Sequence, residues 1–388
     1  MPSPHRVYLA PGMFGFTQVA SFDYFAHVKR ALAARFADAG LALEVHVVDV
    51  MPTAPVRRRA AALAELVTRT AGNDGAIHLL GHSTGGLDAR LVASPGAALP
   101  NRGDVAMWLP RLRTVVTMNT PHYGTPLATF FATTRGQQAL YLLSAFTYIG
   151  LSLGARPLAL ASVIVGLLAR GDEAIGIKLP FLSTTIESAL SVVNNARNPN
   201  VRKYLSAIKQ DQGSMIQLAP EGMDLVLAGF LDRPGVHYLS TVSMAPSAPL
   251  KGWVGNLLHP IRASSLALFT ALHAITAEFD PHYPCSAMSQ VAGRPAASDQ
   301  QEALLSAKLG DAADLRANDG VVPVRSQLWG ELIWAGLGDH LDVLGHYADK
   351  SPEPEPALGH HDWLTSGSSF GDEQFESLMN AVAAGMLR

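Results

Sequence analysis

The first 120 residues alternate between short apolar runs and longer segments with apolar residues at helical spacing. Residues 7–10, 43–50, 77–82 and 112–119 are the apolar runs, and they predict strands. Residues 23–39, 57–70 and 87–92 carry the helical spacing. Strands that alternate with helices of this length predict an α/β fold, with a mostly parallel sheet covered by helices on both faces.

The middle of the chain has a different pattern. Residues 127–232 contain no convincing strand and are strongly apolar, and residues 139–155 carry no charge. We expect a large helical lid here, inserted in a single domain that spans residues 1–388, because a lid over an apolar site needs an apolar face. Two alternatives are plain core helices and a membrane hairpin. Arg156-Pro157 interrupts the apolar stretch, which disfavours the hairpin.

Strands and helices return after the predicted lid. Residues 235–243 and 329–335 predict two further strands, and residues 261–278, 303–313 and 374–387 predict helices. Residues 279–297 have no clear period and predict a loop-rich stretch. The strand predicted at residues 329–335 is the last one, so the loop after it is expected at the edge of the sheet where parallel strands end.

The third predicted strand ends in Gly81-His82-Ser83-Thr84-Gly85, a Gly-x-Ser-x-Gly pattern that leads into a helix. This context is typical of a nucleophile elbow, in which a serine on a strained turn stands at the end of a sheet. Glycine is expected on both sides, because a Cβ at Gly81 or Gly85 would collide with the neighbouring strand or helix. The alternative is a glycine-rich turn with a capping serine. We expect Ser83 to be a nucleophile.

Two later residues supply an acid and a base in the order that α/β-hydrolases use. Asp319 precedes a glycine in a tight turn, and His340 follows the last predicted strand. A catalytic triad needs a rigid, partly desolvated acid that orients the histidine. Taken singly, Asp319 is more typical of an ordinary turn. His361 is an alternative base, and His346 is a further histidine close in sequence.

Two backbone N–H groups are candidates for an oxyanion hole. Thr84 follows Ser83 at the start of a helix, where negative charge is stabilised. Met13 lies in the glycine-bearing loop after the first predicted strand, where α/β-hydrolases place their second donor. The alternative for that loop is an ordinary turn that ends the strand.

The composition restricts the class of protein. The 388 residues carry a net charge of -3 with no basic stripe, so we expect no nucleic-acid partner. Cys285 is the single cysteine, which excludes an intramolecular disulfide. Met1 is not followed by a basic segment and a long apolar region, so we expect a cytoplasmic protein as the sequence is written. A secreted enzyme with a replaced start would look the same.

Four blocks of sequence, in the same order, resemble the bacterial triacylglycerol lipases of the Burkholderia/Pseudomonas type. The blocks are residues 81–87, 119–125, 318–322 and 340–342. The resemblance implies an α/β-hydrolase fold in which Ser83, Asp319 and His340 form the triad. Where these lipases have His-Gly after the first strand, this chain has Pro11-Gly12.

The same resemblance bears on calcium. Asp342 matches the aspartate that follows the catalytic histidine in these lipases, and Asp299 aligns loosely with an upstream ligand. Their next side-chain ligand falls on His346, which is a poor calcium ligand because calcium prefers oxygen. We therefore treat calcium as an optional structural ion, and we expect no required redox or organic cofactor.

These features predict a serine hydrolase that cleaves carboxylic esters with apolar acyl chains, a lipase or esterase, through an acyl-enzyme on Ser83. The expected partner is a small-molecule ester or lipid, with transient contact between the lid and a lipid interface. The alternatives are an acyltransferase, a phospholipase or a thioesterase with the same triad, and a non-catalytic protein of this fold that binds an apolar ligand.

Overall fold

The computed structural model describes most of the chain outside the middle segment. The described residues are 3–13, 18–19, 22–51, 53–100, 103–134, 136–141, 143–144, 206, 208, 211, 213–246, 260–278, 290–291, 294–295, 297–310, 314, 316–347 and 364–388. Most of the predicted lid, Cys285 and the alternative base His361 lie outside these residues. The prediction of a lid at residues 127–232 therefore stays a prediction.

A parallel sheet of six strands forms the centre of the molecule, in the order β10-β7-β6-β5-β1-β4. The strands are β1 (His5–Ala10), β4 (Leu43–Val47), β5 (Ile77–His82), β6 (Leu112–Met118), β7 (His237–Met244) and β10 (Glu331–Leu337). All six strands predicted from the apolar runs are confirmed. Two short antiparallel pairs join β2 (Gln18–Val19) to β3 (Phe22–Asp23), and β8 (Gln290–Val291) to β9 (Arg294–Pro295).

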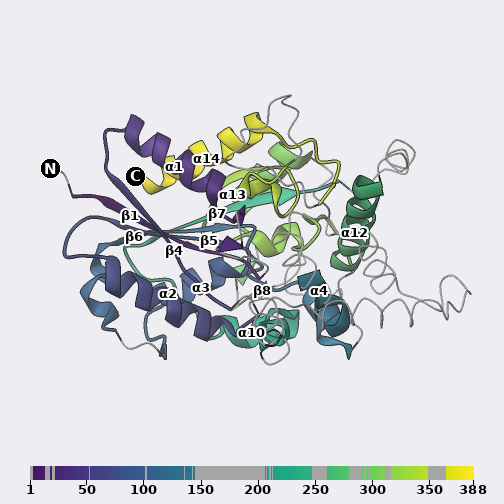
Figure 1. Ribbon diagram of the computed structural model, residues 1–388, viewed down its shortest axis with the longest axis horizontal. Helices are drawn as coiled ribbons and strands as arrows, with labels where there is room; N and C mark the ends of the chain where they lie inside the picture. Colours follow the sequence, from purple (N-terminus) through teal and green to yellow (C-terminus); the bar gives the residue numbers. More distant parts are fainter. Residues whose placement is uncertain are drawn as a thin grey trace, which may run out of the picture.

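Helices cover both faces of this sheet, as the alternating pattern predicts. Figure 1 shows α1 (Ala26–Asp38) and α14 (Asp372–Met386) on one face, and α2 (Val56–Thr70) and α3 (Thr84–Ala93) on the other. Successive residues of β1 point to opposite faces. Val7 and Leu9 join the apolar cluster that contains residues of α1 and α14, whereas Tyr8 and Ala10 join the cluster with residues of α2 and α3. The result is an α/β fold with two buried layers.

The helix α13 (Asp299–Leu309) packs against the edge strand β10 and begins four residues before the predicted start at residue 303. Its first turn is held by a capping box between Ser298 and Gln301. In this arrangement each residue satisfies a backbone N–H of the other. The polar cap therefore extends the helix beyond the stretch that apolar spacing alone predicts.

A third apolar cluster lies among the remaining helices. These are α4 (Pro126–Ala132), α9 (Gly213–Leu218), α10 (Pro220–Leu227) and α12 (Pro260–Thr276). Figure 1 shows α4 and α12 on the side of the sheet where the strands end. Short 3-10 helices occupy the connections: η1 (Val105–Met107), η2 (Leu109–Arg111), η4 (Val324–Gln327) and η5 (Asp342–Leu344). In the part of the chain that the structure describes, no helix has the length and apolar character needed to cross a membrane.

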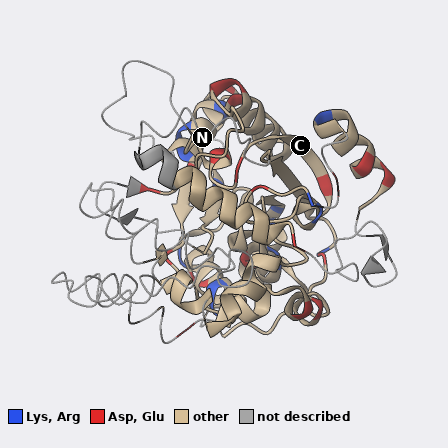
Figure 2. Ribbon diagram, turned by 90° about the vertical axis from the view of Figure 1, so that its right-hand side faces the viewer, with Lys and Arg blue, Asp and Glu red and all other residues tan. Residues whose placement is uncertain are grey.

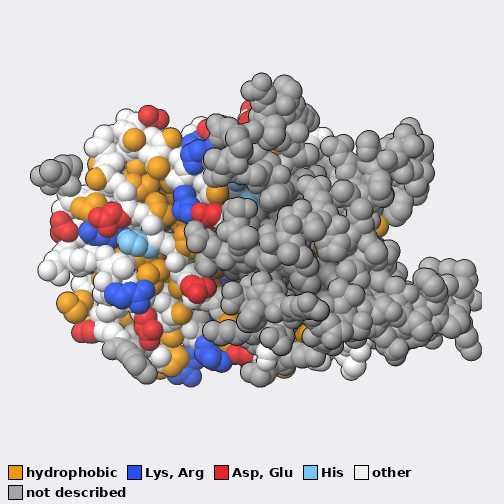
Figure 3. Space-filling model, in the orientation of Figure 1, with side chains coloured by type: hydrophobic (Ala, Val, Ile, Leu, Met, Phe, Trp, Pro, Cys, Tyr) orange, Lys and Arg blue, Asp and Glu red, His pale blue; other side chains and the backbone are white. Residues whose placement is uncertain are grey.

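Charged residues of both signs lie on the described part of the face drawn in Figure 3. Figure 2 shows basic and acidic residues at separate positions along the ribbon, and Figure 3 shows them interspersed with apolar side chains on one face. The described part of the face in Figure 3 therefore presents neither a basic nor an acidic stripe.

The order of the sheet reverses between β1 and β5. From β1 the chain adds β4 on one side, and it then returns to add β5, β6, β7 and β10 in turn on the other side. In open parallel sheets, ligands bind beyond the carboxyl ends of the strands at such a reversal. The two loops that meet here follow β1 and β5, and they contain Gly12 and Ser83.

Candidate active site

Ser83 occupies a sharp turn between β5 and α3. Its backbone φ of 56° lies in the left-handed region, which a residue with a Cβ rarely adopts. A Cβ at Gly81 would lie 2.2 Å from backbone atoms of Gly85, and a Cβ at Gly85 would lie 2.0 Å from the carbonyl oxygen of Ala10. The strand–turn–helix context and the need for both glycines are therefore confirmed. The nucleophilic role of Ser83 stays a prediction.

Asp319 and His340 form a buried hydrogen-bonded pair. His340 Nδ1 lies 2.7 Å from Asp319 Oδ2, and Asp319 is fully buried. The other oxygen, Asp319 Oδ1, accepts hydrogen bonds from the N–H groups of Val321 (2.9 Å) and Val322 (2.7 Å). The backbone adds a further link, because the His340 N–H donates to the Asp319 carbonyl at 3.0 Å. The acid is therefore rigid and desolvated, which is what orienting an imidazole requires.

Asn119 is a supporting residue that the sequence analysis did not single out. It follows β6 directly, has a φ of 49°, and donates from Nδ2 to Asp319 Oδ2 at 2.9 Å and to Ser243 Oγ at 2.5 Å. A signal was present in the sequence, because a polar residue at the carboxyl end of a predicted parallel strand shares the sheet edge with Ser83. Asn119 ties the acid to the neighbouring strands β6 and β7.

Ser83 is connected to this pair by His82, the residue before it in the sequence, which contacts His340. The His82 and His340 rings are 4.7 Å apart between centroids, and His82 Nε2 lies 2.8 Å from the His340 carbonyl oxygen. On the other side, a Cβ at Gly12 would lie 2.7 Å from Ser83 Cβ, so the loop after β1 packs directly against the serine. Among the residues that the structure describes, no hydrogen bond joins the Ser83 hydroxyl to His340.

The two predicted oxyanion donors belong to the two loops that meet at Ser83, the loop after β1 and the turn from β5 into α3. Thr84 is the first residue of α3, where the backbone N–H groups have no partner within the helix. Met13 follows Gly12 in the loop after β1, and its side chain packs against the apolar cluster of α4, α9, α10 and α12. The oxyanion role of both residues stays a prediction.

Burial keeps the polar groups around Ser83 neutral or paired. It lowers the pKa of the His82 imidazole well below its usual range; the charge of the neighbouring His340 ring lowers this pKa further, and the hydrogen bond to the His340 carbonyl opposes the change. It also raises the pKa of the Tyr24 hydroxyl above its usual range. Behind the loop after β1, Arg59 and Asp88 form an ion pair at 2.9 Å with both side chains fully buried. Burial raises the pKa of Asp88 to about 6, and the Arg59 guanidinium opposes this rise.

The residues considered for calcium have other surroundings. Asp342 Oδ2 accepts hydrogen bonds from the Asp339 N–H at 2.8 Å and from Ser368 Oγ at 2.7 Å, so this carboxylate braces the loop after His340. Asp299 is exposed at the start of α13. His346 is buried, and its Nε2 lies 3.2 Å from the Tyr24 carbonyl. Within the described ranges, no three His, Cys, Asp or Glu side chains gather as metal ligands.

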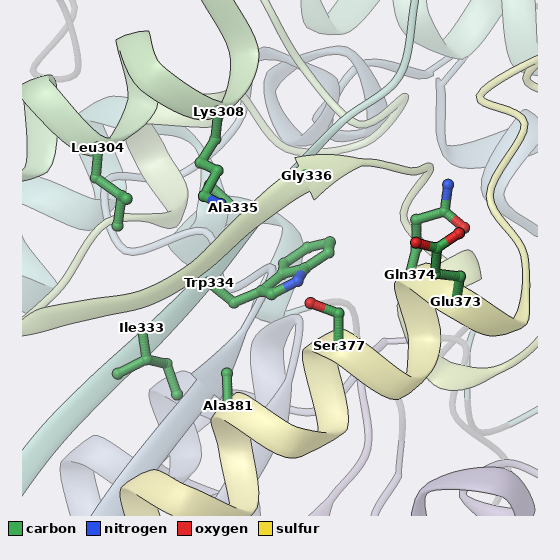
Figure 4. Close-up of a pocket in the computed structure, with 10 residues that line it drawn as sticks. All are labelled: Leu304, Lys308, Ile333, Trp334, Ala335, Gly336, Glu373, Gln374, Ser377 and Ala381. Atoms are coloured by element: carbon green, nitrogen blue, oxygen red, sulfur yellow. The ribbon is translucent and has the colours of Figure 1, made fainter.

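A pocket of about 410 Å³ lies away from these residues, between α13, the edge strand β10 and α14. Figure 4 shows the Trp334 indole crossing it beside Ser377, with Lys308 and Glu373 at opposite sides. None of the residues that line this pocket belongs to the predicted triad or to the predicted oxyanion hole.

Comparison with known proteins gives weak likenesses. No family model matches the chain, and no curated protein matches it. Among solved structures, the chain is similar to EstA from Clostridium botulinum, with 16% identity, a TM-score of 0.49, and coverage of 97% of this chain and 88% of that one. It is also similar to lipase 1 from Pelosinus fermentans, with 14% identity, a TM-score of 0.49, and coverage of 98% and 99%. A third similar structure is the Staphylococcus hyicus lipase, with 15% identity, a TM-score of 0.45, and coverage of 98% of this chain and 96% of that one. Likenesses at this level establish neither family nor activity.

Proposed function

We propose that this protein is a serine hydrolase with an α/β-hydrolase fold that cleaves carboxylic esters, as lipases and esterases do. The observation that carries the proposal is the buried 2.7 Å hydrogen bond between Asp319 and His340, next to a serine with a backbone φ of 56°. These groups come from three separate loops at one edge of the sheet. A strained serine elbow beside a desolvated acid–histidine pair is the arrangement that nucleophilic acyl transfer requires.

In the proposed reaction, His340 Nε2 accepts the proton of Ser83 Oγ as this oxygen attacks the ester carbonyl. Asp319 accepts the hydrogen bond from Nδ1–H, which fixes the tautomer of His340 and stabilises the imidazolium. The N–H groups of Met13 and Thr84 bind the oxyanion, and each contributes about 3 kcal/mol to lowering the barrier. His340 then protonates the leaving alcohol. Water, activated by the same histidine, releases the acid from Ser83.

The surroundings favour an apolar acyl group. Each part of the site has an apolar residue close to it in sequence, and all of these residues belong to or pack against one apolar cluster. They are Met13 after Gly12, Leu87 after Ser83, Val321 after Asp319 and Leu341 after His340. A hydrocarbon chain held beside them would leave water at a free-energy gain of about 0.8 kcal/mol per buried CH₂. We propose that residues 127–232 form the lid over this region and contact a lipid substrate or its interface. The chemistry needs no redox or organic cofactor.

The decisive experiment is a chain-length series of p-nitrophenyl esters with the wild type and Ser83→Ala. We expect hydrolysis by the wild type, with a preference for longer acyl chains, and a loss of at least about 10⁴-fold in kcat for Ser83→Ala. Ser94→Ala is a matched control, because Ser94 is also buried and lies at the other end of α3.

Two outcomes would contradict the proposal. Turnover that persists in Ser83→Ala would remove the serine from the mechanism. A wild type that hydrolyses no ester but binds apolar ligands would indicate a binding protein of this fold. A parallel comparison of His340→Ala with His361→Ala identifies the base, and we expect only the first to abolish turnover.

A further inference from the structure

A line of hydrogen bonds connects the loop after β1 with the loop after β10, and it passes directly behind Ser83. Gly12 N lies 3.3 Å from the Tyr24 hydroxyl, and this hydroxyl lies 2.6 Å from His82 Nδ1. His82 Nε2 lies 2.8 Å from the carbonyl oxygen of His340. Tyr24 and His82 are both buried. The line therefore runs from the residue that packs against Ser83 to the backbone of the proposed base.

The position of every proton along this line follows from the last bond. A carbonyl oxygen only accepts, so His82 Nε2 must carry a proton. A neutral His82 then has a free lone pair on Nδ1, which accepts the Tyr24 O–H. The Tyr24 oxygen in turn accepts the Gly12 N–H. The depressed pKa of His82 agrees with this neutral form. Each donor along the line therefore has one acceptor, and every hydrogen bond points from Gly12 towards His340.

At each end of the line, hydrogen bonds hold the backbone of a loop at the site. At one end, the Pro11 carbonyl accepts a hydrogen bond of 2.5 Å from Arg59, so the Pro11–Gly12 peptide is held at its C=O and at its N–H. The next N–H belongs to Met13, a proposed oxyanion donor. At the other end, the His340 carbonyl is held by His82 and the His340 N–H is held by the Asp319 carbonyl.

We propose that Tyr24 and His82 are positioning residues, which hold the oxyanion loop and the catalytic histidine at a fixed separation on the two sides of Ser83. This inference rests on the proposed ester hydrolysis. Neither side chain needs to touch substrate. Their hydrogen bonds are directed to the two loops that carry the reacting groups, and a misplacement of about 1 Å in such loops costs about 100-fold in rate.

The first test compares Tyr24→Phe with Tyr8→Phe, with p-nitrophenyl butyrate as the substrate. Both tyrosines are buried, and Tyr8 hydrogen-bonds to Thr70 rather than to a residue of the site. We expect Tyr24→Phe to lower kcat by about 10- to 100-fold with KM changed by less than about twofold. We expect Tyr8→Phe to keep kcat within about twofold of the wild type. Equal kcat values for the two variants would overturn the inference.

The second test uses His82→Gln and His78→Gln, two buried histidines on β5. We expect a loss of kcat only in His82→Gln. We also expect the double variant Tyr24→Phe/His82→Gln to lose no more than about twofold beyond the worse single variant, because both changes break the same line. Losses that multiply would mean that the two residues act separately, which contradicts a shared positioning role.

A third measurement separates this inference from the proposed function. In the wild type labelled with ¹⁵N-histidine, long-range ¹H–¹⁵N spectra report the tautomer of His82. We expect a proton on Nε2 and an acceptor at Nδ1. A proton on Nδ1 would overturn the positioning line whether or not esters are hydrolysed. A wild type without ester turnover but with the expected tautomer would overturn the proposed function, and it would leave the hydrogen-bonded line as a link between the two loops without a catalytic role.

Discussion

The serine side of the candidate site is positioned by close backbone packing, whereas the acid–base side is positioned by hydrogen bonds. Around Ser83, Gly81 and Gly85 let backbone segments approach to distances that leave no room for a Cβ. Around Asp319, four donors reach one carboxylate: two backbone N–H groups, the Asn119 amide and His340. One half therefore depends on the absence of side-chain atoms, and the other half depends on the number and direction of polar contacts.

This difference predicts different responses to small changes. A methyl group added on the serine side has to displace backbone, which lowers the stability of the whole fold. On the acid side, exchanging one oxygen for nitrogen leaves the volume unchanged and reverses the direction of the hydrogen bonds. The first kind of variant is expected to lose stability and activity together. The second kind is expected to lose activity far more than stability.

The largest expected effect is that of Asp319→Asn on activity. The amide oxygen can still accept from Val321 and Val322, but its NH₂ group faces the Asn119 amide and His340 Nδ1. His340 is then expected to adopt the wrong tautomer, which costs about 10⁴-fold in kcat in enzymes of this mechanism. The free energy of unfolding should fall by only about 1 to 3 kcal/mol. Ester turnover and urea unfolding measure the two quantities.

Asp314→Asn is the control for that change. Asp314 is an exposed residue of the same connection and accepts a hydrogen bond from the Arg316 N–H. It should leave turnover within about twofold of the wild type. If Asp319→Asn loses stability without a large loss of kcat, then hydrogen bonding at this carboxylate serves the fold rather than the chemistry.

Gly85→Ala is expected to have the next largest effect. The new Cβ would lie 2.0 Å from the Ala10 carbonyl oxygen, so α3 and β1 would have to move apart. We expect a loss of about 3 kcal/mol in the free energy of unfolding, with turnover falling together with it. Gly229→Ala is the control, because Gly229 is exposed and the nearest atom to its added Cβ is 3.6 Å away. If Gly85→Ala is stable but inactive, close packing around Ser83 serves the chemistry and is not needed for the stability of the fold.

The parts of this site that sequence reasoning reached are those with a local signal. The elbow at Ser83 is read from five consecutive residues, and the six strands are read from apolar runs. Asp319 and His340 follow from their order, from the glycine turn that contains Asp319, and from the strand that precedes His340. The position of Asn119 at the end of a predicted strand was a usable signal, but the contacts of Asn119, Tyr24 and His82 were not predictable. These contacts depend on the order of strands in the sheet, which brings together segments that are distant in sequence.

The α13 start was also missed, for a different reason. A capping box is a polar signal at Ser298 and Gln301, and it lies outside the apolar period from which the helix was predicted. The expectation of an optional calcium ion came only from the resemblance to bacterial lipases. In the structure the Asp342 carboxylate accepts hydrogen bonds from its own loop and from Ser368, a contact that similarity of a short motif does not reveal.

The smallest expected effect concerns the pH dependence of stability, and it involves two histidines on β5. Burial lowers the pKa of His78 to about 3 and lowers the pKa of His82 well below its usual range. Below about pH 6.5 the unfolded chain binds protons at both residues, whereas the native state does not. Each histidine therefore lowers the free energy of unfolding by about 1.4 kcal/mol per pH unit as the pH falls. Urea unfolding between pH 7.5 and 5 measures this slope.

Variants of the two histidines are expected to have similar effects on the pH dependence of stability and different effects on turnover. This difference tests which of the two histidines takes part in the site. His78→Gln removes one proton-binding difference and should reduce the slope by about 1.4 kcal/mol per pH unit without a change in turnover at pH 7.5. His82→Gln should reduce the slope by a similar amount, but it also breaks the link between the loop after β1 and His340, so turnover should fall. A slope that is unchanged in His78→Gln would mean that native His78 accepts a proton in this range. In that case the hydrogen bonds from His78 to His5 and Thr114 adapt to the charged ring, and β5 tolerates charge better than its burial implies.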